Sequence, residues 1–199
     1  MNFLAHCFLS PATPHALVGN LLGDFCKGID ANSLHPEIKS GLDNHRYVDK
    51  YTDHHPLVKD ARRLFSDKRR RFSSIVLDVL FDHYLIKHWQ KYSEVPFITF
   101  KQQTYQLLEA ATVYMPEHMA QVMTKVVSQD WFESYQTLDG IGFALDRIAS
   151  RIRFTNQFQN SIEEITALDK QLEQVFLAFF PQLLQQNKWQ STLASKASS

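Results

Sequence analysis

Apolar residues recur every three or four positions along most of the chain, which is the spacing of helices that bury one face. Thr13 and Pro14 precede the first clear repeat, and these residue types suit the N-cap and the first turn of a helix. No segment alternates between apolar and polar residues with a period of two, so the pattern predicts an all-α fold. Besides the central stretch described next, helices are expected over residues 13–26, 36–54, 56–66, 100–114, 116–128, 138–152 and 158–180, the last ending at Pro181.

The stretch of residues 67–92 contains no Pro or Gly, and we expect it to form one long central helix. Asp82 falls in the middle of its apolar stripe, and a buried carboxylate must be paired, hydrogen-bonded or bound to a metal. For Asp82 alone, a structural carboxylate bonded to a neighbouring Arg or Tyr is the simpler interpretation. The stripe expected to be buried consists of Phe72, Ile75, Val79, Ile86 and Trp89.

Length and composition indicate one globular domain. The chain has 199 residues, of which fifteen are Phe and only six are Gly, and this favours a helical protein with large aromatic packing. We expect a single domain over residues 1–190 and a disordered tail over residues 191–199. The formal net charge of zero predicts neither a nucleic-acid nor a membrane partner.

The sequence also favours a cytoplasmic location. No apolar run approaches the roughly 20 residues that span a bilayer. The apolar start of the chain lacks a basic region and is interrupted by His6, so we interpret it as mature protein rather than as a signal peptide. Cys7 and Cys26 fit no metal-binding spacing, and we expect both to be reduced.

Ionisable residues continue the inward face of the helix expected over residues 36–54. The stripe begins with Ile38 and Leu42 and continues with His45 and Asp49, with Asp53 beside it one turn later. Residues four apart project in one row, so the first half of this helix should pack in a core and the second half should face a polar site. A surface His–Asp pair is the alternative.

Two other expected helices carry the same residue types on or near their inward faces. They contribute Asp24 at the end of the first, and Asp78, Asp82 and His83 in the central one. Carboxylate and imidazole ligands without cysteine suit Mn²⁺, Mg²⁺ or Fe²⁺ better than structural zinc. Several carboxylates in one core would repel each other, and a divalent cation removes that conflict. The spacing therefore predicts a metal-dependent hydrolase, and the second half of the chain shows no comparable cluster.

Basic residues crowd the region just before and at the start of the central stretch. They are Lys59, Arg62, Arg63, Lys68, Arg69, Arg70 and Arg71. Such a run is usually a solvated face, but it also suits the docking of an acidic partner. Few aromatic residues are interleaved with it, which argues against single-stranded nucleic acid.

Four motifs, in order along the chain, resemble the acyl-carrier-protein phosphodiesterases, also called holo-ACP hydrolases. They are residues 1–6 (MNFLAH), 19–25 (GNLLGDF), 45–49 (HRYVD) followed by 52–53 (TD), and 78–83 (DVLFDH). The resemblance implies a single helical bundle of the HD-domain phosphohydrolase type with rearranged connectivity. It also implies Mn²⁺-assisted removal of phosphopantetheine from holo-acyl carrier protein, a small acidic protein. The last motif reads Asp-His rather than His-Asp, so ligands cannot be copied from ordinary HD enzymes position by position.

The spacing and the resemblance together suggest roles for the candidate residues. The expected metal ligands are Asp24, His45, Asp82 and His83, with Asp49 and Asp78 next. His6 and Asp53 are candidates for a general acid or for orienting one, and a satisfied core residue is the alternative for His6. Arg46 is a candidate for neutralising the substrate phosphate, with a solvated arginine as the alternative. The carrier protein is expected to dock on Arg62, Arg63, Arg69, Arg70 and Arg71. Two alternatives stay open, namely an HD-type phosphohydrolase of a small nucleotide and a non-catalytic module that binds carrier proteins.

Overall fold

A computed structural model describes residues 1–154 and 157–187, and within these residues the protein is entirely helical. This confirms the predicted all-α fold, while the tail expected over residues 191–199 lies outside the described residues. The helices are α1 (Phe3–Phe8), α2 (Pro14–Leu22), α3 (Pro36–His54), α4 (Pro56–Leu64), α5 (Asp67–Arg70), α6 (Ser73–Lys87), α7 (Phe97–Ala111), α8 (Glu117–Ser128), α9 (Trp131–Ser134), α10 (Leu138–Ala149) and α11 (Ile162–Gln186). Short 3₁₀ turns are η1 (Gly23–Phe25), η2 (Trp89–Lys91) and η3 (Thr112–Tyr114).

The helices that carry the N-terminal motifs begin where the sequence predicts. The Thr13 hydroxyl accepts a hydrogen bond from the backbone N–H of Ala16 and so caps α2. Pro36 starts α3, and Pro56 starts α4, at first-turn positions that need no backbone donor. The range of α3 matches the expected residues 36–54, which places the row of His45 and Asp49 on a continuous helix.

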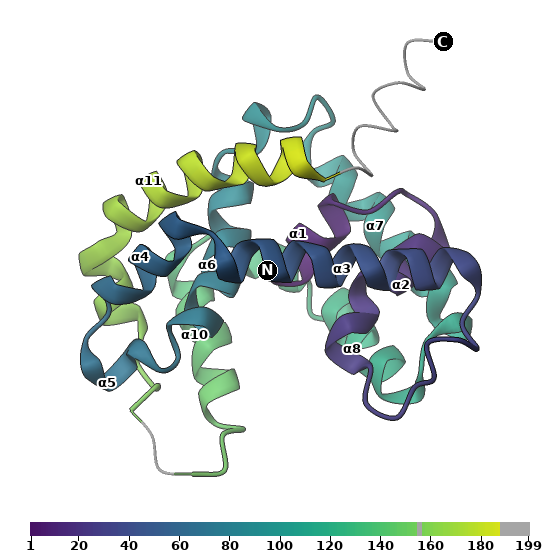
Figure 1. The fold of residues 1–199 in the computed structure, drawn as a ribbon, viewed down its shortest axis with the longest axis horizontal. Helices are drawn as coiled ribbons and strands as arrows, with labels where there is room; N and C mark the ends of the chain where they lie inside the picture. The colour runs from purple at the N-terminus through teal and green to yellow at the C-terminus, as the bar shows by residue number, and fades with distance from the viewer. Residues whose placement is uncertain (155–156, 188–199) are drawn as a thin grey trace.

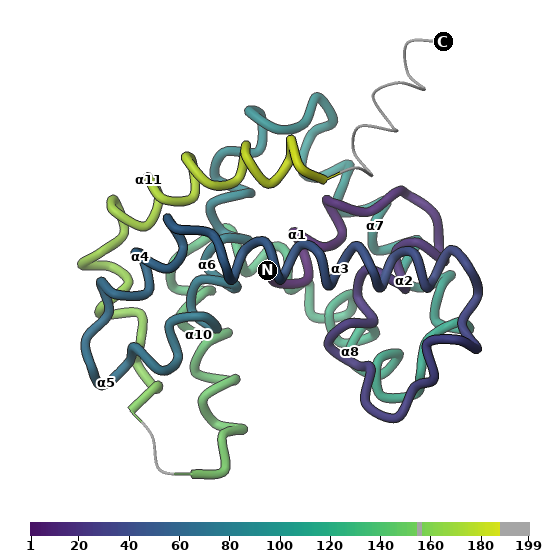
Figure 2. Tube along the Cα trace, in the orientation of Figure 1, coloured from purple at the N-terminus to yellow at the C-terminus, as the bar shows by residue number. Residues whose placement is uncertain are grey.

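The expectation of one helix over residues 67–92 is wrong, because the chain turns between α5 and α6. Ser73 donates its hydroxyl hydrogen to the carbonyl of Arg70, and Phe72 leaves the helical path to stack on Phe158, with ring centroids 4.9 Å apart. Figure 2 shows the trace changing direction after α5. The break separates the exposed basic turn α5 from the buried helix α6.

The buried stripe expected for the central stretch is only partly right: Phe72, Val79 and Trp89 are buried as expected, but they do not form a single buried face. Ile75 and Ile86 are only partly buried, whereas Leu80, Phe81 and Leu85 are fully inaccessible. Neighbouring helices surround α6 on nearly all sides, so periodicity does not reveal its inward face. Asp82 on α6 is nevertheless 0% exposed, as the sequence pattern predicts.

Several other helix boundaries differ from the sequence expectation, among them the end of α2 at Leu22 rather than residue 26 and the start of α11 at Ile162 rather than residue 158. The helix expected over residues 100–114 is α7, which begins at Phe97 directly after Pro96. The last helix, α11, continues through Pro181 instead of ending there. Proline costs one backbone hydrogen bond, but the fully buried Phe179, Phe180 and Leu183 extend the apolar face across it.

The helices surround a core of aliphatic and aromatic side chains. The candidate site lies among the N-terminal helices and α6. In Figure 1, α3 runs across the front, α11 runs along the upper side, and α10 and α8 lie below α3, on the left and on the right. The most extensive packing is that of α2 on α3, while α10 packs on α6 and α7 packs on α8. Cys7 and Cys26 are both free thiols. No helix among the described residues is long and apolar enough to cross a membrane.

Candidate metal centre

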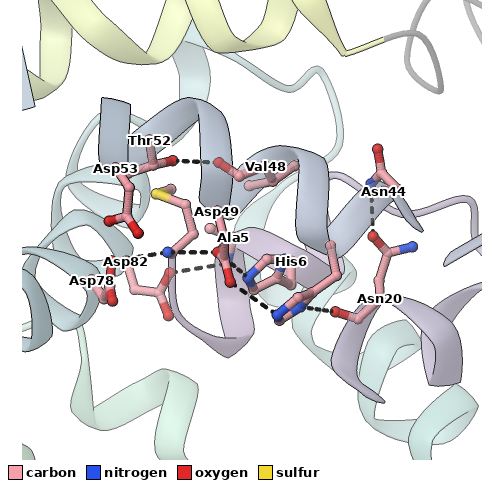
Figure 3. A network of polar contacts seen from close by, with 12 residues as sticks. Ala5, His6, Asn20, Asn44, Val48, Asp49, Thr52, Asp53, Asp78 and Asp82 are labelled. Carbon is pink, nitrogen blue, oxygen red and sulfur yellow. Dashed lines mark hydrogen bonds and ion pairs between the residues drawn. The ribbon is translucent and has the colours of Figure 1, made fainter. Parts of the chain in front are cut away.

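Two buried histidines and a partly exposed aspartate from α1 and α3 form a cluster. His6 Nε2 lies 3.2 Å from Asp49 Oδ1, and His45 Nε2 lies 3.0 Å from Asp49 Oδ2. The two imidazole rings are stacked, with centroids 4.0 Å apart. One ligand atom from each of the three residues lies within 4.8 Å of the others, so a single ion could contact all three. Figure 3 shows His6 and Asp49 pointing toward one another from their two helices.

The orientation of His45 follows from the close packing of α2 on α3. A Cβ atom on Gly19 would overlap the carbonyl oxygen of Ile38, so only glycine allows this approach. The approach brings the Asn20 carbonyl to 2.7 Å from His45 Nδ1, which donates its hydrogen there. The Nε2 lone pair of a neutral His45 then faces Asp49. Histidines that bind metals usually donate their other N–H to a carbonyl in this way.

His6 is fully buried. Its Nε2 lies 3.2 Å from Asp49 Oδ1 without the alignment of a good hydrogen bond, and its Nδ1 has no hydrogen-bond partner within the described residues. These contacts favour a role for His6 in the site over that of a satisfied core residue. Burial lowers the pKa of His6 to about 4, although the carboxylate of Asp49 opposes the shift. The ring is neutral near neutral pH and offers a lone pair. A buried imidazole whose Nε2 lies beside a carboxylate fits a divalent cation. A bond from Nε2 to the cation would offset the cost of burying this nitrogen without a good hydrogen bond.

The electrostatics of the cluster favour an ionised Asp49. Burial would raise the pKa of Asp49, but the hydrogen-bonding histidines His45 and His6 outweigh it and hold this pKa well below its usual range. Burial alone would lower the pKa of His45, yet Asp49 raises it overall. Without a metal, Asp49 therefore favours a proton on the Nε2 of His45, which faces it. A metal would replace that proton, so its binding should release protons.

Asp78 lies beside this cluster, and both Asp78 and Asp49 pair with the N-terminal ammonium group. The α-ammonium group of Met1 is 2.9 Å from Asp78 Oδ1 and 3.2 Å from Asp49 Oδ1. Burial works against the charge on this amine, but Asp78 and Asp49 raise its pKa to about 11. The structure thus brings Asp78 from α6 to the carboxylate of α3, as the spacing predicts.

Asp82 lies on α6 below the first turn of α1. Its Oδ2 accepts the backbone N–H of Leu4 at 3.0 Å, and its Oδ1 accepts that of Ala5 at 2.9 Å. Burial raises the pKa of Asp82 to about 7, although these two N–H groups oppose the shift. Both oxygens are thus engaged by the helix that carries His6. This contact gives Asp82 a clear role in fixing α1, besides the expected role as a metal ligand.

Asp24, on η1 at the end of α2, is reached by solvent but stands in the wall of a cavity. Burial of the surrounding surface raises its pKa, while the nearby His45 opposes the shift. The charges of Asp49, Asp78 and the Met1 ammonium also act on it. Asp24 is therefore the candidate residue that borders both the cluster and open space.

Three other candidate residues are engaged elsewhere. His83 donates from Nδ1 to the carbonyl of Tyr135 at 2.8 Å, and burial lowers its pKa. Asp53 forms an ion pair with Arg62 on α4. Arg46 is 56% exposed and lies 3.6 Å from Asp43 on the same helix. The structure does not bring His83, Asp53 or Arg46 into the group of His6, His45 and Asp49.

The basic residues expected to dock a partner differ in how they are held. Arg63 is 74% exposed, and Arg70 is 51% exposed. Arg71 is exposed and lies over the ring of Phe154. By contrast, Arg69 is 18% exposed and donates to the backbone carbonyls of Gln157 and Gln159, which ties α5 to the segment before α11.

Sequence reasoning missed the part played by the second half of the chain. A cavity of about 620 Å³ borders Asp24 and is walled by residues of α8, α9 and α10, including Trp131 and Arg147. Sequence spacing cannot show this, because these residues are apolar or singly charged and come together only in the fold. The signal that could have pointed to it in the sequence is Phe143, an aromatic residue that lies off the apolar face formed by Ile141 and Leu145, and the structure leaves it exposed.

Comparisons with known proteins agree with the motifs. A family model described as "Acyl carrier protein phosphodiesterase" matches residues 1–183. A protein of that name from Pectobacterium atrosepticum is 37% identical over 191 residues, covering 96% of this chain and 99% of its own. Another from Yersinia pestis is 37% identical over 189 residues, covering 94% and 97%. A third from Escherichia coli O6:H1 is 32% identical over 187 residues, with the same coverage of 94% and 97%. No solved structure matches this chain.

Proposed function

Because the chain belongs to the acyl carrier protein phosphodiesterase family, we propose that it hydrolyses the phosphodiester joining phosphopantetheine to a serine of holo-acyl carrier protein. Water adds across the P–O bond to the serine. The serine oxygen leaves with a proton to give apo-acyl carrier protein, and the phosphate stays on pantetheine. The observation that supports this best is the buried cluster of His6, His45 and Asp49, bordered by Asp24 at an open cavity. An arrangement of the HD-domain type, with rearranged connectivity, belongs to the same proposal.

The donor set suits a divalent metal ion, and we propose Mn²⁺, with Mg²⁺ or Fe²⁺ as alternatives. His6, His45 and Asp49 would hold it, and Asp24 and Asp78 would add carboxylate oxygens from the two flanking helices. When bound, such an ion lowers the pKa of a water molecule and polarises a phosphoryl oxygen. His6 is assigned here as a ligand rather than as a general acid, because a pKa of about 4 leaves it unprotonated near neutrality.

Residues around the cluster keep its donors in place. The Asn20 carbonyl holds His45 in the tautomer whose Nε2 faces Asp49. Asp82 fixes the first turn of α1 through two amides and thereby positions His6, one residue beyond Ala5. These contacts preorganise the three donors, so little reorganisation accompanies the binding of metal or substrate. Asp24 lines the open cavity, through which a substrate would reach the donors.

We propose that the acidic carrier protein docks on the basic face of α4 and α5. Arg63, Arg70 and Arg71 are exposed there, whereas Arg62 pairs with Asp53 and Arg69 is tied to backbone carbonyls. Opposite charge on the partner would speed encounter and orient it, an effect that salt screens. A cytoplasmic location is part of this proposal, since Cys7 and Cys26 are free thiols.

The decisive experiment incubates the purified chain with holo-acyl carrier protein and Mn²⁺, and follows the carrier protein by mass spectrometry. We expect the loss of one phosphopantetheine per carrier protein and no loss in the presence of a chelator. Asp49→Asn should abolish both Mn²⁺ binding and turnover, because it removes the carboxylate shared by both histidines. Asp43→Asn, an exposed change on the same helix, should retain both. An intact carrier protein together with rapid hydrolysis of nucleotides would instead support a nucleotide phosphohydrolase, and no hydrolysis of either would support a binding module.

A further inference from the structure

A cavity of about 620 Å³ opens beside the candidate metal centre, between α8 on one side and α10 on the other. Its volume lies within the range of pockets that bury small organic ligands. Phe3 of α1 and Phe25 of η1 line it, together with Trp131, Phe143 and Arg147, which are termed its outer wall. Phe143 is 64% exposed, which is unusual for a large aromatic residue on a helix that buries its other face.

The walls combine aromatic surface with a few fixed polar groups. The Phe3 ring is stacked on both Phe25 and Trp131, with centroids 6.3 Å apart in each pair. The Arg147 guanidinium lies over the Trp131 ring at 5.2 Å and over the Phe143 ring at 5.8 Å. Gln129 Oε1 accepts from Trp131 Nε1 at 3.0 Å and from Arg147 at 3.2 Å. These contacts hold the outer wall in one arrangement.

Asp24 connects the cavity with the candidate metal centre. Asp24 lines the cavity, and its carboxylate lies close enough to His45 and Asp49 to feel their charges. Asn2, the residue after the Met1 ammonium that pairs with Asp49, lines the same cavity and donates to the Tyr135 hydroxyl at 3.3 Å. A phosphate held at the cluster would therefore have an attached chain leading directly into this space.

We propose that this cavity binds the pantetheine arm of the substrate, with Phe3, Trp131 and Phe143 against its apolar atoms and Gln129 and Arg147 beside its amides. The inference rests on the proposed function, which supplies a substrate whose phosphate carries such an arm. The arm is an amphipathic chain with a branched apolar segment and two amides. A mostly aromatic wall with few polar groups matches that chemistry, whereas the polar surface of a carrier protein would leave the aromatic wall poorly covered.

The test uses pantetheine, which lacks the phosphate, as a probe of the full-length, Mn²⁺-loaded protein. We expect it to change the fluorescence of Trp131 and to inhibit turnover of holo-acyl carrier protein competitively. Ala144→Trp would fill the cavity from α10, and we expect it to raise KM about tenfold and to weaken pantetheine binding equally, with Mn²⁺ content unchanged. Ala110→Trp, a matched change at an exposed position of α7, should leave both values as in the wild type. Trp131→Phe, a milder variant, should lose the fluorescence response and keep its fold.

The outcomes separate this inference from the proposed function. If holo-acyl carrier protein is hydrolysed but millimolar pantetheine neither inhibits nor changes the fluorescence, and Ala144→Trp has a normal KM, the arm binds elsewhere and the inference is overturned. If pantetheine binds and Ala144→Trp abolishes that binding while no carrier protein is hydrolysed, the cavity is confirmed as an arm site and the proposed reaction fails.

Discussion

Asp82→Asn is the substitution that best tests how the site is held together. Asp82 is fully buried, and its two oxygens accept the backbone N–H groups of Leu4 and Ala5 at the start of α1. Asparagine keeps the shape of the side chain but offers only one oxygen. Above the Asp82 pKa of about 7, where the wild-type carboxylate is ionised, one of the two amides in the variant must then face an NH₂ group, and neither group can accept a hydrogen.

The cost of this change follows from one buried donor left unsatisfied, which is about 1–3 kcal/mol. In a chain of this size, 1 kcal/mol shifts Tm by roughly 2–4 °C. We therefore expect Asp82→Asn to lower Tm by roughly 4–8 °C, taking about 2 kcal/mol as the central value. Asp82→Ala removes both acceptors and should cost about twice as much. Thermal unfolding followed by circular dichroism, in the presence of a chelator, measures both shifts.

Metal affinity then distinguishes the two roles of Asp82. If Asp82 positions α1, and through it His6, Mn²⁺ affinity in Asp82→Asn should fall about 10–100-fold, as it does when a group that orients a ligand is removed. The Asp43→Asn variant on the surface of α3 should match the wild type in Tm and in affinity. A normal Tm combined with complete loss of Mn²⁺ binding would refute the positioning argument and identify Asp82 as a ligand only.

Three further predictions follow from the described contacts. Without metal, the free energy of unfolding should fall as pH rises from about 4 to 7, because folded Asp82 keeps its proton up to a pKa of about 7 while the unfolded residue releases it near 3.8. Urea titrations across this pH range should show the decrease in the wild type and not in Asp82→Asn. Replacing Arg63 and Arg71 together by Glu should raise KM for the carrier protein about tenfold at low salt, with kcat and Mn²⁺ content unchanged. Lys170→Glu on α11 should have no effect, and an unchanged KM in the double variant would exclude docking on the basic face of α4 and α5. Arg69→Ala should instead lower Tm by a few degrees, since it removes donors to the carbonyls of Gln157 and Gln159, and a stable variant with a raised KM would return Arg69 to the docking face.

Helix starts could be predicted from local chemistry, but the central helix could not. Thr13, Pro36 and Pro56 act within one turn, so their effect depends little on the rest of the fold. The face that α6 buries depends instead on which helices surround it, and it is covered on nearly all sides. For the same reason Pro181 does not end α11, because buried phenylalanines on both sides of it depend on tertiary contacts.

The candidate site shows the same division between local and distant information. The row of His45 and Asp49 is set by helical spacing, and the structure places both at the cluster. His6 lies on a helix of six residues, too short for periodicity to show its inward face, so only the fold reveals that it completes the cluster. His83 follows Asp82 in sequence, yet consecutive helical residues diverge by about 100°, and that rotation directs it to Tyr135. A motif therefore shows which residue types matter. Helix geometry decides which of them reach the candidate metal centre and which, like Asp82, support α1.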